Sequence, residues 1–486
     1  MSFVSIEFIV FAALVIPLFF WFRQNLRWLL LLGASYLFYA YWQPSYILLI
    51  LFSTLVDYIV ALALDGTAAD KTSRRKFLFA CSVTANIGLL FTFKYANLFS
   101  QAATDLSVAL GIPLAFGTLD VLLPVGISFY TFQSMAYTFD VYRGRLKAER
   151  HIGIFALYVA FFPQLVAGPI ERAGNMLPQF RRKFSFDYDR IVSGLRRILW
   201  GVFKKIVIAD RLAIYVNAVY GDLESYTGLS LIVATLFFTF QIYCDFSAYS
   251  DIAIGVARVL GFRLMENFRR PKLATSMRDF WHRWHISLST WLRDYVYIAL
   301  GGNRKGLRRQ SINLMITFAL AGLWHGANWT FLLWGIYHGG LLLLENAFRS
   351  RNISLLPCNL VGRVLGIFYA FTLAYLGWIL FRASSVSEVD YILRHLLDFS
   401  AGFADLTAPF GASLLPSRLE FALAFLLIAL VLTVDILDER KGLGLMRIFT
   451  SRPLLLRWVI YYLLLFGICL SLINVEAVEV FYYFQF

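Results

Sequence analysis

Two histidines stand in apolar stretches of this chain, where ionisable side chains are rare. His325 follows the apolar run 312–324, and His285 lies within an aromatic stretch, 280–295. An ionisable group inside a membrane span is costly and is usually kept for function, facing a cavity or a partner. Imidazole also exchanges protons near neutral pH. The two histidines therefore predict proton-transfer chemistry carried out within a lipid bilayer.

The composition places the chain in a membrane. Of 486 residues, 59% are hydrophobic and only 15% are charged, a balance that the surface of a soluble protein of this length does not tolerate. A span needs roughly 20 apolar residues, and about a dozen stretches qualify, which predicts an all-α polytopic membrane protein. We place the spans at about 3–22, 27–42, 45–64, 77–99, 121–141, 195–217, 229–257, 311–325, 328–347, 363–383, 419–435 and 454–474.

The net charge of +14 is concentrated in short connections between apolar stretches. This pattern indicates membrane orientation and argues against a nucleic-acid partner. Connections 65–76, 258–283 and 437–457 are basic and are expected in the cytoplasm, whereas 218–228 and 384–418 are expected outside. Both termini are then outside, and the basic residues of 258–283 are expected to contact membrane lipids.

Two apolar segments, 151–168 and 284–300, lie between basic connections and cannot be simple crossings. They are expected to be re-entrant or to lie along the interface, around a central tunnel. The second segment would carry His285 into the membrane from the cytoplasmic side. His325 lies about 14 residues beyond Ser311, or roughly 21 Å of helix, so the two histidines would face one tunnel from opposite ends. We expect one domain over 1–486, with a core at about 121–347 and later spans at 363–474.

Further polar residues are candidates for the wall of this tunnel. Four of them lie in the span 229–257: Asp245, Ser247, Tyr249 and Asp251. They either orient a histidine and contact substrate or form a buried hydrogen-bond network, and the network is the favoured interpretation. Asp294 either fixes an imidazole tautomer or simply pairs with Arg293. Trp324 and Asn328, which flank His325, complete the predicted support.

Each histidine also has a structural explanation. His325 can be bonded to a neighbouring carbonyl, and His285 can be an interfacial anchor among tryptophans. His282 and His285 have the spacing of a helical metal pair, but no cluster of carboxylates or thiols completes such a site. His338 is expected to be a packing residue. We therefore expect no metal and no bound cofactor.

Six segments together resemble the membrane-bound O-acyltransferase family, most closely the bacterial branch that acetylates exopolysaccharides such as alginate. The match extends along nearly the whole chain and departs from the usual core motif at Ala248, where the family has glycine. The matching segments are Leu123–Gln133, Phe162–Ile170, Gln241–Asp251, Phe280–Ser287, Gly322–Gly326 and Phe481–Phe486.

The resemblance implies a bacterial inner-membrane enzyme that transfers an acyl group through a tunnel. His325 matches the near-invariant family histidine and His285 the second one. The implied donor is acetyl-coenzyme A or another acyl thioester on the cytoplasmic side. The implied acceptor is a hydroxyl of a secreted polysaccharide, reached directly or through a periplasmic SGNH-type acetyltransferase partner.

Other functions stay open from sequence. A different envelope acceptor (cellulose, peptidoglycan or teichoic acid) fits the same resemblance. A proton-coupled transporter also has buried ionisable groups and about a dozen spans, although the chain shows no two-fold internal repeat. A scaffold subunit without activity of its own would leave His325 replaceable.

Overall fold

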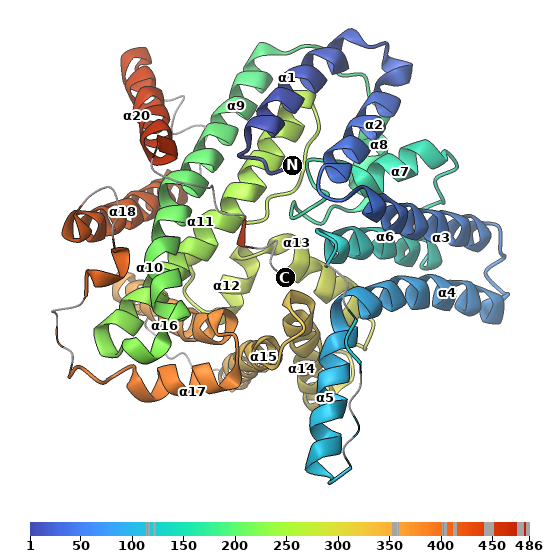
Figure 1. Cartoon of the computed structure of the whole chain (residues 1–486). Coiled ribbons are helices and arrows are strands. Elements are labelled where there is room, and N and C mark those ends of the chain that lie inside the picture. Colours follow the sequence, from blue (N-terminus) through green and yellow to red (C-terminus); the bar gives the residue numbers. More distant parts are fainter. Residues whose placement is uncertain are drawn as a thin grey trace. The chain divides into compact units, whose positions relative to one another are not determined.

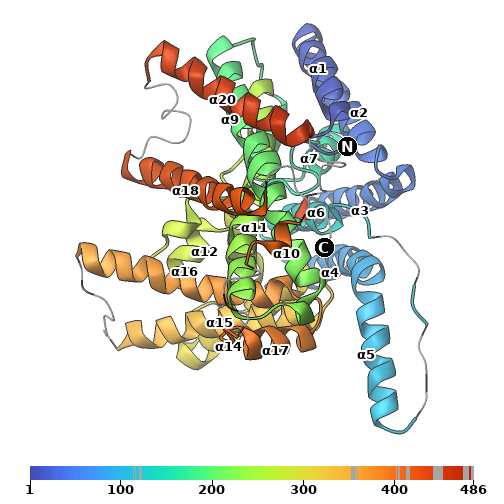
Figure 2. The ribbon, with the colours of Figure 1, turned by 60° about the vertical axis from the view of Figure 1, so that its left-hand side comes forward.

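The fold is described from a computed structural model, drawn in Figure 1 and, turned, in Figure 2. Over the residues that it describes, all regular structure is helical and no strand occurs. These residues are 1–112, 114, 117–119, 123–351, 357, 359–400, 402, 406–411, 416–441, 452–473 and 481–482. The matching segment Leu123–Gln133 falls within this part of the chain, whereas the end of Phe481–Phe486 falls outside it.

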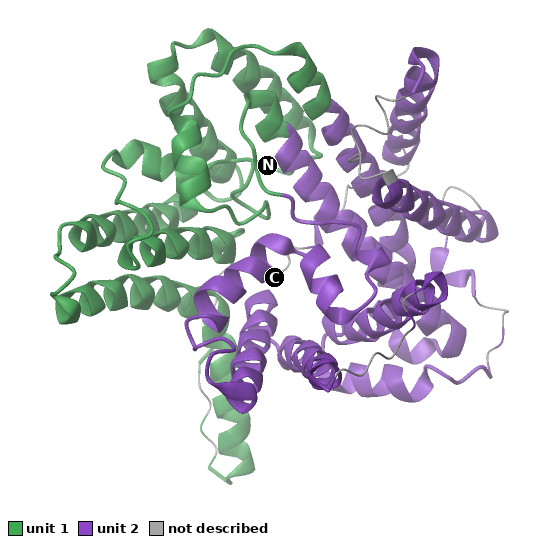
Figure 3. Ribbon diagram, turned by 180° about the vertical axis from the view of Figure 1, so that it is seen from behind, with its two compact units in different colours: residues 1–194, 256–265, 484–486 green, residues 195–255, 266–483 purple. Residues whose placement is uncertain are grey.

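The chain divides into two compact units, coloured separately in Figure 3. Unit 1 comprises residues 1–194 and 256–265 of the described chain. Within it, α3 packs against α4, α6 and α7, and α2 packs against α7. Its helices are α1 (Ile6–Trp21), α2 (Arg27–Ala40), α3 (Ile47–Asp65), α4 (Thr72–Leu90), α5 (Ala96–Ala109), α6 (Ile127–Tyr142), α7 (Ile152–Ala160), α8 (Ala173–Phe180) and the start of α9 (Tyr188–Phe203).

Unit 2 comprises residues 195–255 and 266–483 and contains both candidate histidines. A π-helical turn, η4 (Lys204–Ala209), continues α9 into α10, and another, η7 (Arg293–Tyr297), follows α13. Its further helices are α10 (Asp210–Gly221), α11 (Gly228–Leu260, as far as residue 255), α12 (Met277–Arg283), α13 (Ile286–Leu292), α14 (Gly306–His325), α15 (Trp329–Ser350), α16 (Leu360–Arg382), α17 (Val386–His395), α18 (Ser417–Lys441) and α20 (Leu454–Ile473).

Close packing of α14 on α15 fixes the position of His325, which ends α14. A Cβ atom at Gly322 would lie 2.1 Å from the carbonyl oxygen of Phe331, and one at Gly335 would lie 2.2 Å from that of Phe318. The two backbones therefore approach at positions that only glycine can occupy. Helix α15 also packs on α12 and α16, so these helices hold the end of α14 that carries His325 in place.

Six helices among the described residues are long and apolar enough to cross a membrane, so this is a multi-pass membrane protein. They coincide with six of the twelve predicted spans: Pro44–Asp65, Thr72–Ala109, Gly228–Leu260, Leu360–Arg382, Ser417–Arg440 and Leu454–Ile473. The other six predicted spans coincide with helices that are shorter or less apolar, namely α1, α2, α6, α9 with α10, α14 and α15. The total number of crossings therefore stays a prediction.

The two segments predicted not to cross the membrane form short helices. Helix α7, within 151–168, has 9 residues, and α13, within 284–300, has 7 and continues as the 5-residue π-helical turn η7. A membrane crossing takes roughly 20 residues, so none of these helices spans a bilayer alone. The re-entrant or interfacial placement of 151–168 and 284–300 stays a prediction.

Candidate active site

His285 and His325 lie side by side in unit 2. Their ring centroids are 6.5 Å apart, and the residues are 0% and 2% exposed. The prediction that they face one tunnel from opposite ends is therefore wrong. His285 joins α12 to α13 with a left-handed backbone, φ 43°, and this reversal brings its ring to the end of α14.

Aromatic side chains surround both histidines. The Trp324 ring lies 5.7 Å from His285 and 5.0 Å from His325. Phe246 of α11 contacts His285 edge-on at 4.7 Å. Trp334 of α15 lies 4.9 Å from His325. Reactive groups enclosed in this way are shielded from bulk water, which is what an acyl transfer that competes with hydrolysis requires.

Three indole N–H groups lie within this aromatic wall, from Trp281, Trp334 and Trp378. Trp334 is 5.6 Å from Trp281 and 6.4 Å from Trp378, measured between ring centroids. All three indole nitrogens are buried, and none makes a hydrogen bond to another residue that the structure describes. An indole N–H only donates, so each of these groups can bond an acceptor oxygen such as that of a carbonyl.

Asn267 contacts His285 and was not recognised from sequence. Its Oδ1 lies 3.2 Å from His285 Nδ1, and the residue is 0% exposed. Asn267 precedes His285 by 18 positions and lies in the connection 258–283, whose basic residues predict a membrane interface. The sequence offers one signal for Asn267, namely an uncharged polar residue among basic ones. The sequence does not show its contact with His285, because that contact depends on how the connection folds.

Asp251 lies in a buried ion-pair network and not among the histidine contacts. Its Oδ2 is 2.8 Å from Lys204 Nζ, and its Oδ1 is 2.8 Å from Arg197 Nε. Lys204 Nζ also donates to Ser247 Oγ at 2.6 Å. The favoured prediction of a buried polar network is right in kind, but the partners are cations on α9 and η4. A lysine within a predicted span was the signal that could have revealed them.

Asp245 forms a second buried ion pair. Its Oδ1 lies 2.9 Å from Lys205 Nζ, which also lies 2.7 Å from Asp210 Oδ1. The backbone N–H of Tyr482 donates to Asp245 Oδ2 at 2.9 Å. Tyr249 stacks edge-on against Phe481 at 5.1 Å, so the predicted residues of α11 hold the described end of the chain.

The remaining predicted residues make polar contacts with other residues. Arg293 Nε pairs with Asp294 Oδ1 at 2.8 Å, which is the simple pairing that the sequence left open. Asn328 caps α15 through Thr330 N and donates to the Ser384 carbonyl at 2.7 Å. His282 is exposed whereas His285 is buried, so they do not form a metal pair. No group of three potential ligands that could hold a metal occurs within the described ranges.

Lys272 corrects the expectation that the basic residues of 258–283 face lipid. It is 4% exposed, and its ammonium donates to the Thr239 carbonyl at 2.8 Å. Its Nζ lies 5.6 Å from the Trp284 ring and 5.8 Å from the Trp378 ring. Burial lowers the pKa of Lys272 to about 7, although the aromatic faces favour the charged form. The residue therefore packs against the Trp284 and Trp378 rings.

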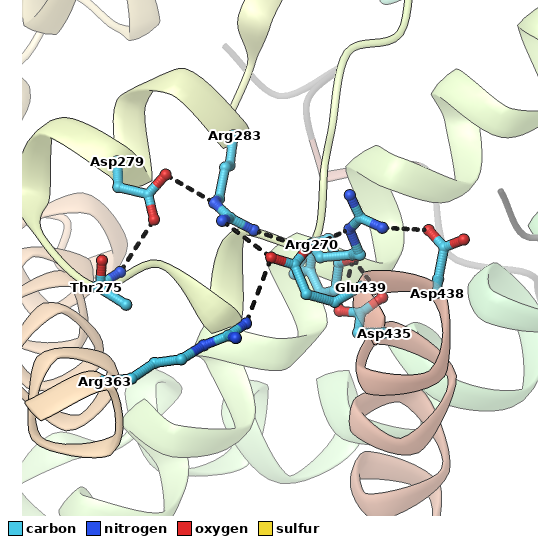
Figure 4. A network of polar contacts seen from close by, with 9 residues as sticks. Arg270, Thr275, Asp279, Arg283, Arg363, Asp435, Asp438 and Glu439 are labelled. Atoms are coloured by element: carbon cyan, nitrogen blue, oxygen red, sulfur yellow. Dashed lines mark hydrogen bonds and ion pairs between the residues drawn. The ribbon is translucent and has the colours of Figure 1, made fainter. Parts of the chain in front are cut away.

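Charged residues brace α12 against the end of α18, as Figure 4 shows. Arg283, two positions before His285, bonds Glu439 at 3.1 Å and Asp279 at 2.8 Å. Arg270 pairs with Glu439 at 2.9 Å and with Asp438 at 3.1 Å. An open cavity of about 570 Å³ adjoins this network. It is lined by Leu273, Thr275, Asp279, Arg283, Pro357, Asn359, Gly362, Arg363 and Glu439.

Comparison with known proteins assigns the family. A model of the membrane-bound O-acyltransferase family matches residues 151–357, which include both histidines. The chain is 41% identical over 377 residues to a probable alginate O-acetylase of Azotobacter vinelandii, covering 78% of this chain and 74% of the relative. It is 34% identical over 398 residues to the peptidoglycan O-acetyltransferase of Helicobacter pylori, covering 76% and 73%.

A third relative is more distant. The teichoic acid D-alanyltransferase of Bacillus subtilis is 28% identical over 277 residues, covering 53% of this chain and 68% of the relative. The names of these relatives all describe acyl transfer, which sets aside the transporter that the sequence left open. The chain belongs to the membrane-bound O-acyltransferase family and is a multi-pass membrane enzyme that transfers acyl groups.

Proposed function

We propose that this enzyme moves acetyl groups from a cytoplasmic acyl thioester, such as acetyl-coenzyme A, across the bacterial inner membrane for O-acetylation of a secreted polysaccharide such as alginate. In this proposal about twelve spans surround a central tunnel, and both termini are periplasmic. A periplasmic SGNH-type acetyltransferase takes the acetyl group onward, or the polysaccharide accepts it directly.

The observation that carries the proposal is the buried pair of histidines inside an aromatic wall that offers hydrogen-bond donors. His325 is the proposed general base and His285 its partner in proton transfer. Acyl transfer from a thioester needs a base, donors for the developing oxyanion and exclusion of water. In support of this, the imidazoles of His285 and His325 can accept a proton, indole N–H groups in the surrounding wall can donate to an oxyanion, and burial keeps bulk water away.

The chemistry balances without a further reagent. The acceptor oxygen attacks the thioester carbonyl carbon, and its proton passes to the imidazole of His325. The C–O bond forms while the C–S bond breaks, and the proton then passes to the thiolate that leaves. Indole N–H groups such as that of Trp334 stabilise the carbonyl oxygen while it carries negative charge.

The acceptor is proposed to be alginate or a chemically similar polysaccharide, because relatives named for alginate acetylation share about 40% identity with this chain. The peptidoglycan acetyltransferase is less similar, at 34% identity, and peptidoglycan is the second candidate acceptor.

The test uses purified enzyme in vesicles with radiolabelled acetyl-coenzyme A, with and without a purified periplasmic SGNH-type acetyltransferase. We expect label to reach the partner or an added polysaccharide with the wild type. The His325→Ala and His325→Gln variants should transfer none while reaching wild-type abundance in the membrane. Transfer by either variant contradicts the assignment of His325, and no transfer by wild-type protein from any acyl thioester contradicts the proposed donor.

A further inference from the structure

A single buried amide organises the turn that carries His285. Asn267 Oδ1 lies 3.2 Å from His285 Nδ1. The same oxygen accepts from the Ser287 backbone N–H at 3.2 Å and from Ser287 Oγ at 2.9 Å. Asn267, His285 and Ser287 are each 0% exposed, so these contacts are made away from bulk water.

The Ser287 backbone N–H determines which way the Asn267 amide points. A backbone N–H can only donate, so the side-chain atom that faces it is the oxygen and not the NH₂ group. The other end agrees, because Asn267 Nδ2 donates to Ser250 Oγ of α11 at 3.3 Å. The orientation of the amide therefore follows from its neighbours, and it is not an arbitrary choice between two similar atoms.

The amide oxygen in turn determines the protonation of His285. An oxygen that only accepts requires a donor at Nδ1, so the neutral imidazole carries its hydrogen on Nδ1. Its Nε2 is then the unprotonated nitrogen. Asn267 also holds the backbone next to His285, because Ile286 N donates to the Asn267 carbonyl at 2.9 Å. His285 itself has a left-handed φ of 43°.

We propose that Asn267 is the positioning residue of this active site, holding His285 as the Nδ1–H tautomer so that Nε2 is the nitrogen that exchanges protons during acyl transfer. The inference rests on the proposed role of His285 in proton transfer. A neutral amide at this place orients the ring without stabilising an imidazolium, whereas a carboxylate would favour the charged form. Asn267 thus keeps His285 able to accept a proton.

The tautomer is measured directly by solid-state nuclear magnetic resonance of the protein labelled with ¹⁵N-histidine in lipid bilayers. The spectrum of His285→Gln identifies the His285 signals by their loss. We expect a protonated Nδ1 and an unprotonated Nε2 in the wild type, and loss of this single tautomer in Asn267→Leu. A protonated Nε2 with a bare Nδ1 in the wild type overturns the inference. This readout does not depend on acetyl transfer, so it separates the inference from the proposed function.

Activity provides the second readout. In Asn267→Asp the size and shape of the side chain are kept, and the pH at which acetyl transfer falls to half on the acid side should rise by about one unit or more. The matched control is Asn313→Asp, because Asn313 is also 0% exposed and its amide donates to the Gly302 carbonyl at 2.9 Å. We expect no shift there. An unchanged profile in Asn267→Asp, or an equal shift in both variants, overturns a positioning role.

Discussion

Replacement of Asp251 by asparagine should destabilise the enzyme far more than the same change at Asp245. Asp251 is the one carboxylate within ion-pair distance of Lys204 over the described ranges, and the lysine side chain is only 5% exposed. Arg197 keeps a second partner, since its Nη1 also bonds Glu266 at 2.7 Å. Asp251→Asn therefore strands the buried charge of Lys204.

The expected loss of stability in each variant depends on how many carboxylates remain beside the buried lysine. Stranding a buried charge by removing its partner costs about 3–5 kcal/mol. Lys205 faces both Asp210 and Asp245, so Asp245→Asn leaves one carboxylate in place. An amide oxygen can still accept the backbone hydrogen bond at position 245, so we expect a cost of about 1 kcal/mol there.

The assay is the midpoint of heat-induced loss of the monodisperse species in detergent, measured by size-exclusion chromatography for wild type and variants. We expect a large fall for Asp251→Asn, a small one for Asp245→Asn, and recovery when Asp251→Asn is combined with Lys204→Met, which removes the stranded charge. Equal falls for the two single variants, or no recovery in the double variant, would refute the reasoning from stranded charge.

Three further outcomes are expected. His285→Ala should lower the rate of acetyl transfer at least about 10²-fold. His282→Arg should leave that rate nearly unchanged, because His282 is exposed. Equal losses of rate at both positions would argue that His285 is an anchoring residue. Trp334→Phe should lower kcat/KM about 10-fold through loss of one donor to the carbonyl oxygen, and wild-type kinetics would exclude that donor. The third test uses a variant without the native exposed cysteines and a thiol reagent that cannot cross the membrane. Added outside, the reagent should label a cysteine that replaces Asp222 but not one that replaces Ser73, both of which are exposed positions. Reversed labelling would contradict the predicted orientation in the membrane.

The sequence by itself determined the class of the protein and its family. Hydropathy over windows of about 20 residues is a local property, so the membrane class follows without a structure, and six of the predicted spans are helices long and apolar enough to cross. The two histidines were also found from sequence, because an imidazole in an apolar run is anomalous wherever the chain folds.

Only the tertiary structure decided which residues meet. His285 and His325 are 40 positions apart, and their proximity depends on the reversal at His285 and on the close approach of α14 and α15. Asn267 and Lys272 lie in a connection whose basic composition predicts an interface, yet both are buried. Composition records how many charges a segment carries, whereas burial and partners depend on packing between segments distant in sequence. The tautomer of His285 is therefore decided by a side chain 18 positions away, through a contact that no local pattern encodes.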